Sequence, residues 1–480
     1  MRIPGCRTTI PALLTIVVLG AISAHAQTFT TLASFDGTNG AIPEFGVLVQ
    51  GRDGNLYGAT RGPAGACSGT TFKITTAGKL TSLHCFGGAE GEQPYAGLVL
   101  GTNGAFYGAA FLGGANTWGT VFKMTSKGKV TPIYSFCAQP GCTDGVAPFF
   151  GPVEASDGKF YGTTPNAPAV GNQGTIFKVT AAGKLTTLLS FDGTNGADPS
   201  SPVLQAADGS LYGTTGSSAA FFFGTLYKIT TKGAFTTLHG FTGADGFLPA
   251  QNLAQAPDGN IYGTTYWGGV NNECANGCGT AFQFNPTTGT FKTIYNFCTE
   301  TNCADGSAPN GVMLGSDGNL YGTTQGGGNA WGTVFELTPA GALTTLYAFC
   351  AQTNCIDGSI PQAGLLQATN GTFYGVTTWG GASAADGSVG DGTVFSVSVG
   401  LGPFVSFVNK AAKVGQTVQI LGQGLQGTSA VSFNGTPANF STRSANYLTA
   451  NVPSGATTGY VTVITPGGTL TSNVPFQVVH

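Results

Sequence analysis

Cysteine is the reactive side chain that this sequence places in the clearest pattern. Eight of the 11 cysteines form pairs separated by only three or four residues. Such pairs are typical of zinc ligands or of local disulfides. A zinc site takes four ligands and no histidine lies beside any pair, so the sequence favours disulfides and predicts no metal and no cofactor. The predicted disulfides are Cys67 with Cys85, Cys137 with Cys142, Cys274 with Cys278, Cys298 with Cys303, and Cys350 with Cys355.

Tryptophan is the side chain best suited to bind a ligand by stacking. Each of the four tryptophans stands directly before Gly-Gly or Gly-Thr. They are Trp118, Trp267, Trp331 and Trp379. A flat ring on a stiff loop stacks on an apolar surface and loses little conformational entropy. These four are therefore the candidate ligand-binding residues. The alternative interpretation is that each ring packs under its own loop as a local core, because large aromatic rings are usually well buried.

Candidates for acid–base catalysis are few. His84 and His239 occupy a place that holds tyrosine in other copies of the repeat described below, which is typical of a surface strand. An acidic residue followed by proline recurs at Asp36, Glu90, Asp144, Asp192, Asp245, Asp305 and Asp357. Turn chemistry explains this pattern, since Asp-Gly begins a turn and proline closes it, and the spacing of a calcium loop is absent. We predict no catalytic residue, although two such carboxylates could serve a glycosidase.

All these residues occupy fixed places in a repeat. Tyr-Gly dipeptides recur at Tyr57, Tyr107, Tyr161, Tyr212, Tyr262, Tyr321 and Tyr374. Asp-Gly or Asn-Gly precedes each one and predicts a two-residue hairpin turn in which both residues tolerate positive φ. The first copy divides into strands a to d over residues 46–50, 55–60, 69–75 and 79–86. Strand c carries a buried aromatic ring at one place, beginning with Phe72, as a sheet packed on both faces requires.

Seven four-stranded copies predict an all-β fold, a seven-bladed β-propeller over residues 27–400. The segment 28–35 resembles a strand d, whereas the last copy stops after its strand c at Ser398. The N-terminal strand is therefore expected to complete the last blade as a clasp. Alternating strand direction places the b–c and d–a loops, with the tryptophans, most cysteines and the acidic residues, on one face. The short a–b and c–d turns lie on the other.

The repeat unit, DG-(N/S/K)-L-YG-T-T followed by GT-V-F-K-(I/V)-T and G-K-L-T-T-L, resembles the GloVer tandem repeat of exported bacterial proteins over residues 28–398. This resemblance implies no activity, ligand or catalytic residue. Residues 401–480 are similar to the IPT/TIG immunoglobulin-like domain, a small β-sandwich. That resemblance rests on Gly422, Phe433-Asn434-Gly435, Val452-Pro453, Gly459, Gly467-Gly468 and Phe476.

The N-terminus has the features of a secretory signal peptide over residues 1–26. Arg2 and Arg7 precede an apolar run that ends in Ala24-His25-Ala26, a cleavage signal. The run is shorter than the about 20 residues of a membrane span, so we expect none after signal removal. Charged residues are only 8% of the chain and the net charge is −3, which argues against nucleic acid and anionic membranes as partners.

Together these features predict a monomeric bacterial protein that is secreted or held at the cell surface, with the periplasm as an alternative. The expected function is non-enzymatic binding of an extracellular glycan or protein through the face with the tryptophans. One alternative is an extracellular hydrolase or lyase acting on polysaccharide. The other is a structural component of the cell envelope.

Overall fold

The computed structural model describes residues 27–479 except 63–64, 169–170, 172, 200, 219–221 and 387–388. The predicted signal peptide lies outside the described residues. Strands form nearly all of the regular structure. The 3₁₀ helices are η1 (Gly88–Glu90), η2 (Pro140–Cys142), η4 (Thr301–Cys303), η5 (Thr353–Cys355) and η6 (Ala382–Asp386). Among the described residues, no helix has the length and apolar character that crossing a membrane requires.

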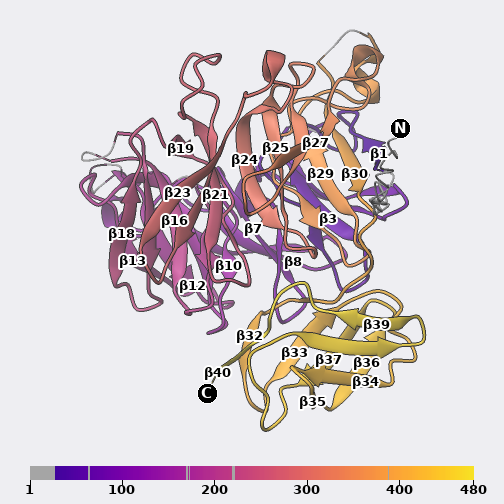
Figure 1. The fold of residues 1–480 in the computed structure, drawn as a ribbon. Helices are drawn as coiled ribbons and strands as arrows, with labels where there is room; N and C mark the ends of the chain where they lie inside the picture. Colours follow the sequence, from indigo (N-terminus) through magenta and orange to yellow (C-terminus); the bar gives the residue numbers. More distant parts are fainter. Residues whose placement is uncertain are drawn as a thin grey trace, which may run out of the picture.

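Seven antiparallel sheets, each of four or five strands, form the blades of a propeller, as predicted (Figure 1). Blade 1 contains β2 (Val49–Gln50), β3 (Leu56–Thr60), β4 (Thr70–Ile74) and β5 (Leu80–Cys85). Blade 2 contains β6 (Val99–Leu100), β7 (Phe106–Ala110), β8 (Thr120–Met124) and β9 (Val130–Ser135). Blade 3 contains β10 (Val153–Glu154), β11 (Phe160–Thr164), β12 (Thr175–Val179) and β13 (Leu185–Ser190).

Blades 4 and 5 each have an additional short strand. Blade 4 contains β14 (Ala197–Pro199), β15 (Leu204–Gln205), β16 (Leu211–Ser217), β17 (Thr225–Ile229) and β18 (Phe235–Gly240). Blade 5 contains β19 (Phe247–Pro249), β20 (Ala254–Gln255), β21 (Ile261–Trp267), β22 (Thr280–Asn285) and β23 (Thr290–Asn296). Blade 6 contains β24 (Ser307–Leu314), β25 (Leu320–Gly326), β26 (Thr333–Leu337) and β27 (Leu343–Ala348).

Blade 7 is built from both ends of the propeller sequence and confirms the predicted clasp. It contains β28 (Leu366–Gln367), β29 (Phe373–Thr377), β30 (Thr393–Ser398) and β1 (Thr28–Ser34). The N-terminal strand β1 pairs antiparallel with β30, with Thr28 opposite Ser398. Apolar residues of blades 7 and 1, including Val394 and Phe72, share one buried cluster. The ring is therefore closed by both hydrogen bonds and packing.

The Tyr-Gly motif has a packing role in every blade. The tyrosine ring is buried between neighbouring blades, and the phenylalanine or tyrosine of strand c is fully buried behind it. A Cβ atom added to Gly58 would lie 2.5 Å from Cζ of Phe72. Glycine follows the tyrosine because only a residue without a side chain leaves room for that ring.

The predicted two-residue turn is wrong in its geometry. In blade 1 the loop runs from Gly51 to Asn55, and only Gly54 has a positive φ, of 79°. Asp53 instead accepts a hydrogen bond of 2.8 Å from the hydroxyl of Tyr57. The aspartate recurs because it anchors the buried tyrosine, and not because it adopts a left-handed conformation.

A second unit follows the propeller and forms a small β-sandwich. Its first sheet contains β31 (Ser406–Phe407), β33 (Thr417–Leu421), β37 (Tyr447–Asn451) and β36 (Phe440–Ser444). Its second sheet contains β35 (Thr436–Pro437), β34 (Ala430–Phe433), β38 (Val461–Thr465) and β39 (Gly468–Thr471). A parallel pair, β32 (Ala411–Lys413) and β40 (Gln477–Val479), lies beside them. The two sheets enclose one apolar core.

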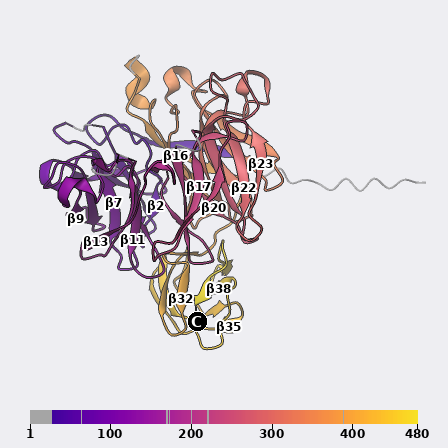
Figure 2. The ribbon, with the colours of Figure 1, turned by 90° about the vertical axis from the view of Figure 1, so that its left-hand side faces the viewer.

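The sandwich lies against the face of the propeller that carries the short turns, which we call the turn face (Figures 1 and 2). Asn446 Nδ2 donates to the carbonyl oxygen of Asp53 at 3.2 Å. The guanidinium of Arg52 lies over the ring of Tyr447, 4.6 Å from its centroid. Leu421 joins the apolar cluster between blades 1 and 2. The second unit therefore occupies the turn face and leaves the opposite face, the loop face, uncovered by it.

Candidate functional site

The recurring acidic residues of the loop face hold their own loops. Asp144 is fully buried and accepts hydrogen bonds from the hydroxyl of Tyr134 at 2.7 Å and from the backbone N–H of Ala138 at 2.9 Å. Asp305 and Asp357 are equally buried and make corresponding bonds. These carboxylates are occupied by the protein itself, which agrees with their interpretation as turn residues.

The two histidines of the described chain belong to the same arrangement. His239 Nε2 lies 2.9 Å from a carboxylate oxygen of Asp245, and His84 Nε2 lies 2.8 Å from one of Glu90. Burial by itself would raise the pKa of Asp245, but hydrogen bonds from His239 and Thr242 lower it below its usual value. Each histidine thus replaces a tyrosine as the partner of a loop carboxylate.

The four tryptophans divide into two exposed and two partly buried rings. Trp118 is 44% exposed and Trp331 is 43% exposed. The ring of Trp267 packs against Phe247 at a centroid distance of 5.5 Å. Trp379 is also partly buried, and its backbone exchanges two hydrogen bonds with Ser359. Trp118 and Trp331 are the two with most surface free for stacking, and ligand binding by any of the four stays a prediction.

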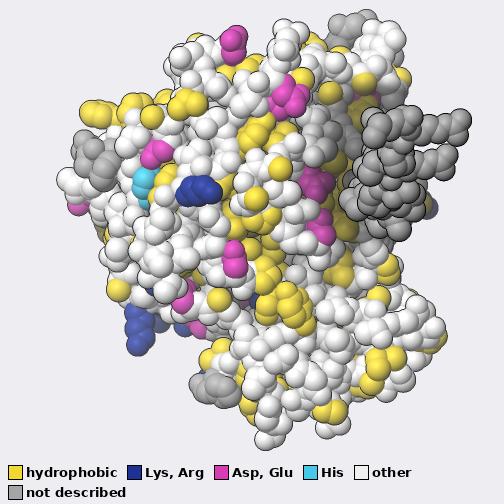
Figure 3. Space-filling view, in the orientation of Figure 1, with side chains coloured by type: hydrophobic (Ala, Val, Ile, Leu, Met, Phe, Trp, Pro, Cys, Tyr) yellow, Lys and Arg dark blue, Asp and Glu magenta, His cyan; other side chains and the backbone are white. Residues whose placement is uncertain are grey.

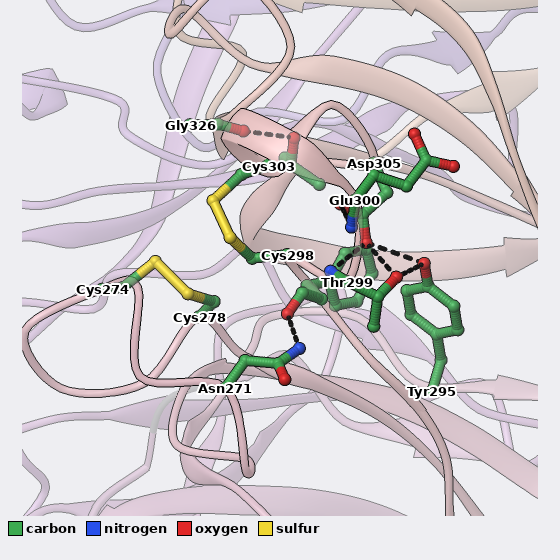
Figure 4. Close-up of a disulfide and its surroundings, with 12 residues drawn as sticks. Asn271, Cys274, Cys278, Tyr295, Cys298, Thr299, Glu300, Cys303, Asp305 and Gly326 are labelled. Carbon is green, nitrogen blue, oxygen red and sulfur yellow. Dashed lines mark hydrogen bonds between the residues drawn. A yellow bond between two sulfur atoms is a disulfide. The ribbon is translucent and has the colours of Figure 1, made fainter.

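Five disulfides join the cysteine pairs that the sequence predicts. Two of these pairs come together in space, which the sequence did not indicate. The disulfide Cys274–Cys278 in the b–c loop of blade 5 lies beside Cys298–Cys303 in the loop from blade 5 to blade 6 (Figure 4).

A funnel of about 500 Å³ opens at the centre of the loop face. It collects side chains from all seven blades, either just after strand b or around the proline that precedes strand a. No tryptophan is among the described residues that line it. Those residues include Phe45, Phe111, Phe149, Phe150, Asn166, Asp198, Leu248, Gln251, Tyr266, Asn310, Gln325 and Gln362.

One wall of the funnel is aromatic and comes from blades 1 to 3. Phe149 packs against Phe45 at a centroid distance of 5.3 Å and against Phe111 at 5.5 Å. Tyr95 lies behind them, 4.7 Å from Phe149 and 5.1 Å from Phe111. All four rings are only partly buried. Edge-to-face and offset contacts of this kind hold the rings as one rigid apolar surface.

The opposite wall is formed by amides of blades 6 and 7 and by a tyrosine of blade 5. The hydroxyl of Thr378 donates to Gln362 at 2.9 Å, and the Gln362 amide donates to Gln325 at 3.3 Å. Gln325 in turn donates to Asn310 at 2.7 Å and accepts from the Tyr266 hydroxyl at 2.9 Å. Linked amides keep fixed orientations and retain further donors and acceptors for a ligand.

Asp198 of blade 4 is the acidic residue between the two walls. Its side chain is exposed to the space of the funnel, and none of the hydrogen bonds or ion pairs in the described structure pairs its carboxylate with a protein group. The surrounding protein atoms desolvate this carboxyl and raise its pKa above the usual value. A carboxylate held in a cavity without a protein partner is available to a ligand.

The residue directly before the recurring proline, which is Asp198 in blade 4, has a strained backbone in every blade. Asp198 precedes a proline and has a φ of 53°, a left-handed conformation that residues other than glycine seldom adopt. The equivalent residues share it, with φ between 50° and 55°, at Ile42, Gln93, Ala147, Leu248, Ala308 and Ile360. Because this conformation recurs in all seven blades, it belongs to the repeat, and of these seven residues only Asp198 and Leu248 line the funnel.

The charges near the funnel are otherwise neutralised. Behind the aromatic wall, Arg61 forms an ion pair with Glu44 and lies over the ring of Tyr95, 5.0 Å from its centroid. Burial raises the pKa of Glu44, and the adjacent Arg61 opposes that shift. On the side of the molecule drawn in Figure 3, charged side chains are few among the uncharged groups. Apart from Asp198, the described residues that line the funnel are uncharged.

The sequence does carry a signal for this funnel. When the seven repeats are aligned, the residue after strand b is Arg61, Phe111, Pro165, Gly216, Tyr266, Gln325 or Thr378. The residue after the recurring proline is Glu44, Tyr95, Phe149, Ser200, Ala250, Asn310 or Gln362. These two places vary, whereas the proline before the second place and the Tyr-Gly motif of strand b are the same in all seven copies. Constant residues build the blades, and the variable ones give the funnel two different walls.

The solved structures to which this chain is similar share little sequence with it. An oligogalacturonate lyase from Vibrio parahaemolyticus is 12% identical, with 78% of this chain and 96% of that chain covered and a TM-score of 0.46. A gluconolactonase from Xanthomonas campestris is 14% identical, with 63% and 84% covered and a TM-score of 0.39. A search of curated proteins finds no match.

Family models account for both parts of the chain. The model of the IPT/TIG domain matches residues 403–478, the second unit. An IPT/TIG domain together with five disulfides indicates an extracellular protein. The model described as the Gloeobacter/Verrucomicrobia repeat matches residues 18–203, 139–301 and 270–428, so the chain belongs to this repeat family.

Proposed function

We propose that this protein is an extracellular glycan-binding protein that takes its ligand into the funnel of the loop face. One observation carries the proposal: an aromatic wall faces an amide wall, with the carboxylate of Asp198 between them. A sugar ring has an apolar face of C–H groups and a rim of hydroxyls. The aromatic rings would stack on the first, and the amides and carboxylate would hydrogen-bond the second.

The dimensions of the funnel agree with such a ligand. Small-molecule sites usually have volumes of about 300 to 1,000 Å³, and this funnel has about 500 Å³. Trp118 and Trp331 stand farther out on the loop face, where they would contact a longer chain. We therefore expect the funnel to bind the end of a glycan and the exposed tryptophans to add affinity only for oligomers.

The second unit would position this site. Figure 2 shows the second unit on the side of the propeller opposite the loop face, so it leaves the loops around the funnel uncovered. We infer that it serves as a spacer or attachment module and that the protein is secreted or displayed on a bacterial surface, with the periplasm as the alternative. Size-exclusion chromatography with light scattering would test the predicted monomer.

A glycan array screened with the full-length protein, followed by titration calorimetry with the best oligosaccharide, tests the proposal. Phe149→Ala should weaken binding about 30-fold, since loss of a central aromatic contact costs about 2 kcal/mol. Phe222→Ala serves as a matched control, because it removes the same type of ring from an exposed loop of the same face outside the funnel. Equal affinities of both variants and the wild type would exclude the funnel, provided that thermal melts show each variant folded.

A hydrolase or lyase acting on polysaccharide is a second candidate, favoured by Asp198. A carboxyl with a raised pKa in a cleft is suited to accept or donate a proton during bond cleavage. Incubation with plant and bacterial polysaccharides, followed by assays for new reducing ends and for unsaturated products, tests this activity. Asp198→Asn should abolish it, and activity that persists in this variant would rule out Asp198 as the catalytic group.

A further inference from the structure

The two neighbouring disulfides of blade 5 bring four cysteine sulfurs into one small volume. The Sγ atoms of Cys274, Cys278, Cys298 and Cys303 all lie within 4.8 Å of one another. The two pairs come from different loops, one between β21 and β22 and the other between β23 and β24, and Figure 4 shows them side by side. Cys278 and Cys298 are buried, so the cluster is shielded from water on one side.

The same chain contains two loops that show what the cluster adds. Cys137–Cys142 and Cys350–Cys355 occupy the places that correspond to Cys298–Cys303 in other blades, and each follows the same hydrogen-bonding plan around a buried aspartate. Within the described residues, only the blade 5 pair has a second pair of cysteines beside it. A disulfide that merely stiffens this loop needs no such neighbour.

The spacing of the sulfurs is close to that of a tetrathiolate metal site. Zinc bound to four thiolates at about 2.3 Å in a tetrahedron separates the sulfurs by about 3.8 Å. The four sulfurs here already lie within 4.8 Å of one another. Once both disulfides are open, side-chain rotations and small loop adjustments suffice to reach that geometry.

The loops that carry the cysteines are fixed by hydrogen bonds that do not involve sulfur. The N–H of Gly277 donates to the carbonyl of Cys274 at 3.0 Å, and that of Ala308 donates to the carbonyl of Cys278 at 2.9 Å. Asp305 accepts from the N–H of Thr299 at 2.9 Å and from the Tyr295 hydroxyl at 2.7 Å. These bonds remain after reduction, so the four thiols are held together.

We propose that this cluster is a redox-gated zinc site, with two disulfides in the oxidised protein and one Zn²⁺ bound by four thiolates in the reduced protein. A dithiol reductant transfers two electrons and two protons to each disulfide and itself becomes a disulfide. Two dithiols thus open both bonds and yield four thiols. Zn²⁺ then displaces the four thiol protons as it binds, because thiolate is a preferred ligand of this metal.

Metal titration of the reduced full-length protein tests this proposal. The protein is reduced with a phosphine, desalted without oxygen and titrated with Co²⁺ and then Zn²⁺. We expect one strongly bound Co²⁺ per chain with the absorption of a tetrathiolate complex, displaced by Zn²⁺. The double variant Cys274→Ser/Cys278→Ser should weaken binding at least tenfold, whereas Cys350→Ser/Cys355→Ser should leave it unchanged.

Absence of this complex in the reduced wild type, or equal binding by the two double variants, would overturn the proposal. Alkylation mapped by mass spectrometry gives a second readout on the wild type, which does not depend on the folding of any variant. Zn²⁺ should protect the cysteines of the cluster from alkylation and leave those of the pair Cys350–Cys355 reactive. Uniform protection, or none, would equally contradict a site at this cluster.

Discussion

Carboxylates on the loop face occupy two regions that differ in their partners. At the loops between blades, Asp305 is fully buried and accepts bonds from two backbone N–H groups and a tyrosine. In the funnel, the side chain of Asp198 is exposed to the cavity. No group of the described residues forms a hydrogen bond or an ion pair with its carboxylate. The first kind recurs in the repeats and builds the fold. The second occurs in one blade only and is available to a ligand, so recurrence marks structure whereas variation marks the site.

Removal of the Asp305 carboxylate should produce the largest loss of stability. Asp305→Ala removes the carboxylate that accepts bonds from the N–H groups of Thr299 and Glu300 and from the Tyr295 hydroxyl, which keeps a 2.8 Å contact with the Thr299 hydroxyl. A hydrogen bond to a charged group contributes about 1.5 to 3 kcal/mol. Because Thr299 and Glu300 are exposed and their N–H groups can bond to water, we expect the free energy of unfolding to fall by about 3 kcal/mol in total. Chemical denaturation measures this, and a loss below about 1 kcal/mol would mean that the loop carboxylates do not hold the fold.

The Asp245–His239 contact should give a smaller, pH-dependent contribution. The pKa of Asp245 is lower in the folded protein than in the unfolded chain. The carboxylate therefore stabilises the fold at a pH above its pKa in the unfolded chain. This stabilisation is lost as the pH falls through its lower pKa in the folded protein. Asp245→Asn should melt at a lower temperature than the wild type near neutral pH, with the difference vanishing in acid. A difference that grows towards acid would reverse this assignment.

Asp198 should show the opposite pH dependence and the smallest effect on stability. Its pKa is raised in the folded protein, so the folded state binds the proton more tightly than the unfolded chain. Stability then declines as the pH rises from the unfolded pKa through the folded one. Asp198→Asn should melt slightly above the wild type near neutral pH and match it in acid. Calorimetric scans across this range provide the measurement, and destabilisation of the variant at neutral pH would show that the carboxylate has a structural partner.

The sequence alone predicts the parts of the fold that lie within one repeat. The spacing of the hairpins and the burial of the Phe72 ring follow from residues a few tens of positions apart. The partner strand of β1 follows from the number of strands in each repeat. The conformation of the Asp53-Gly54 turn was mispredicted, because the buried hydroxyl of Tyr57 decides the role of the aspartate. The propensity of a residue for positive φ carries no information about that contact.

The funnel could not be predicted in the same way because it arises between blades, and the cysteine cluster could not because its two disulfides lie in separate loops of blade 5. Phe45 and Phe149 are about a hundred residues apart in the chain, yet their rings are in contact. Cys274 and Cys298 belong to separate loops, and their spacing resembles two independent disulfides. Spacing along the chain reveals the strands and turns of a repeat, whereas the folded loops determine which cysteines meet and the closed ring determines which variable residues meet at its axis.

A crystal structure of the protein with the oligosaccharide chosen by the glycan screen would show directly whether the funnel binds the ligand. We expect a sugar ring stacked on Phe111 or Phe149, with a hydroxyl within hydrogen-bond distance of the Asp198 carboxylate. A glycan bound only on Trp118 or Trp331, with the funnel filled by water, would contradict it.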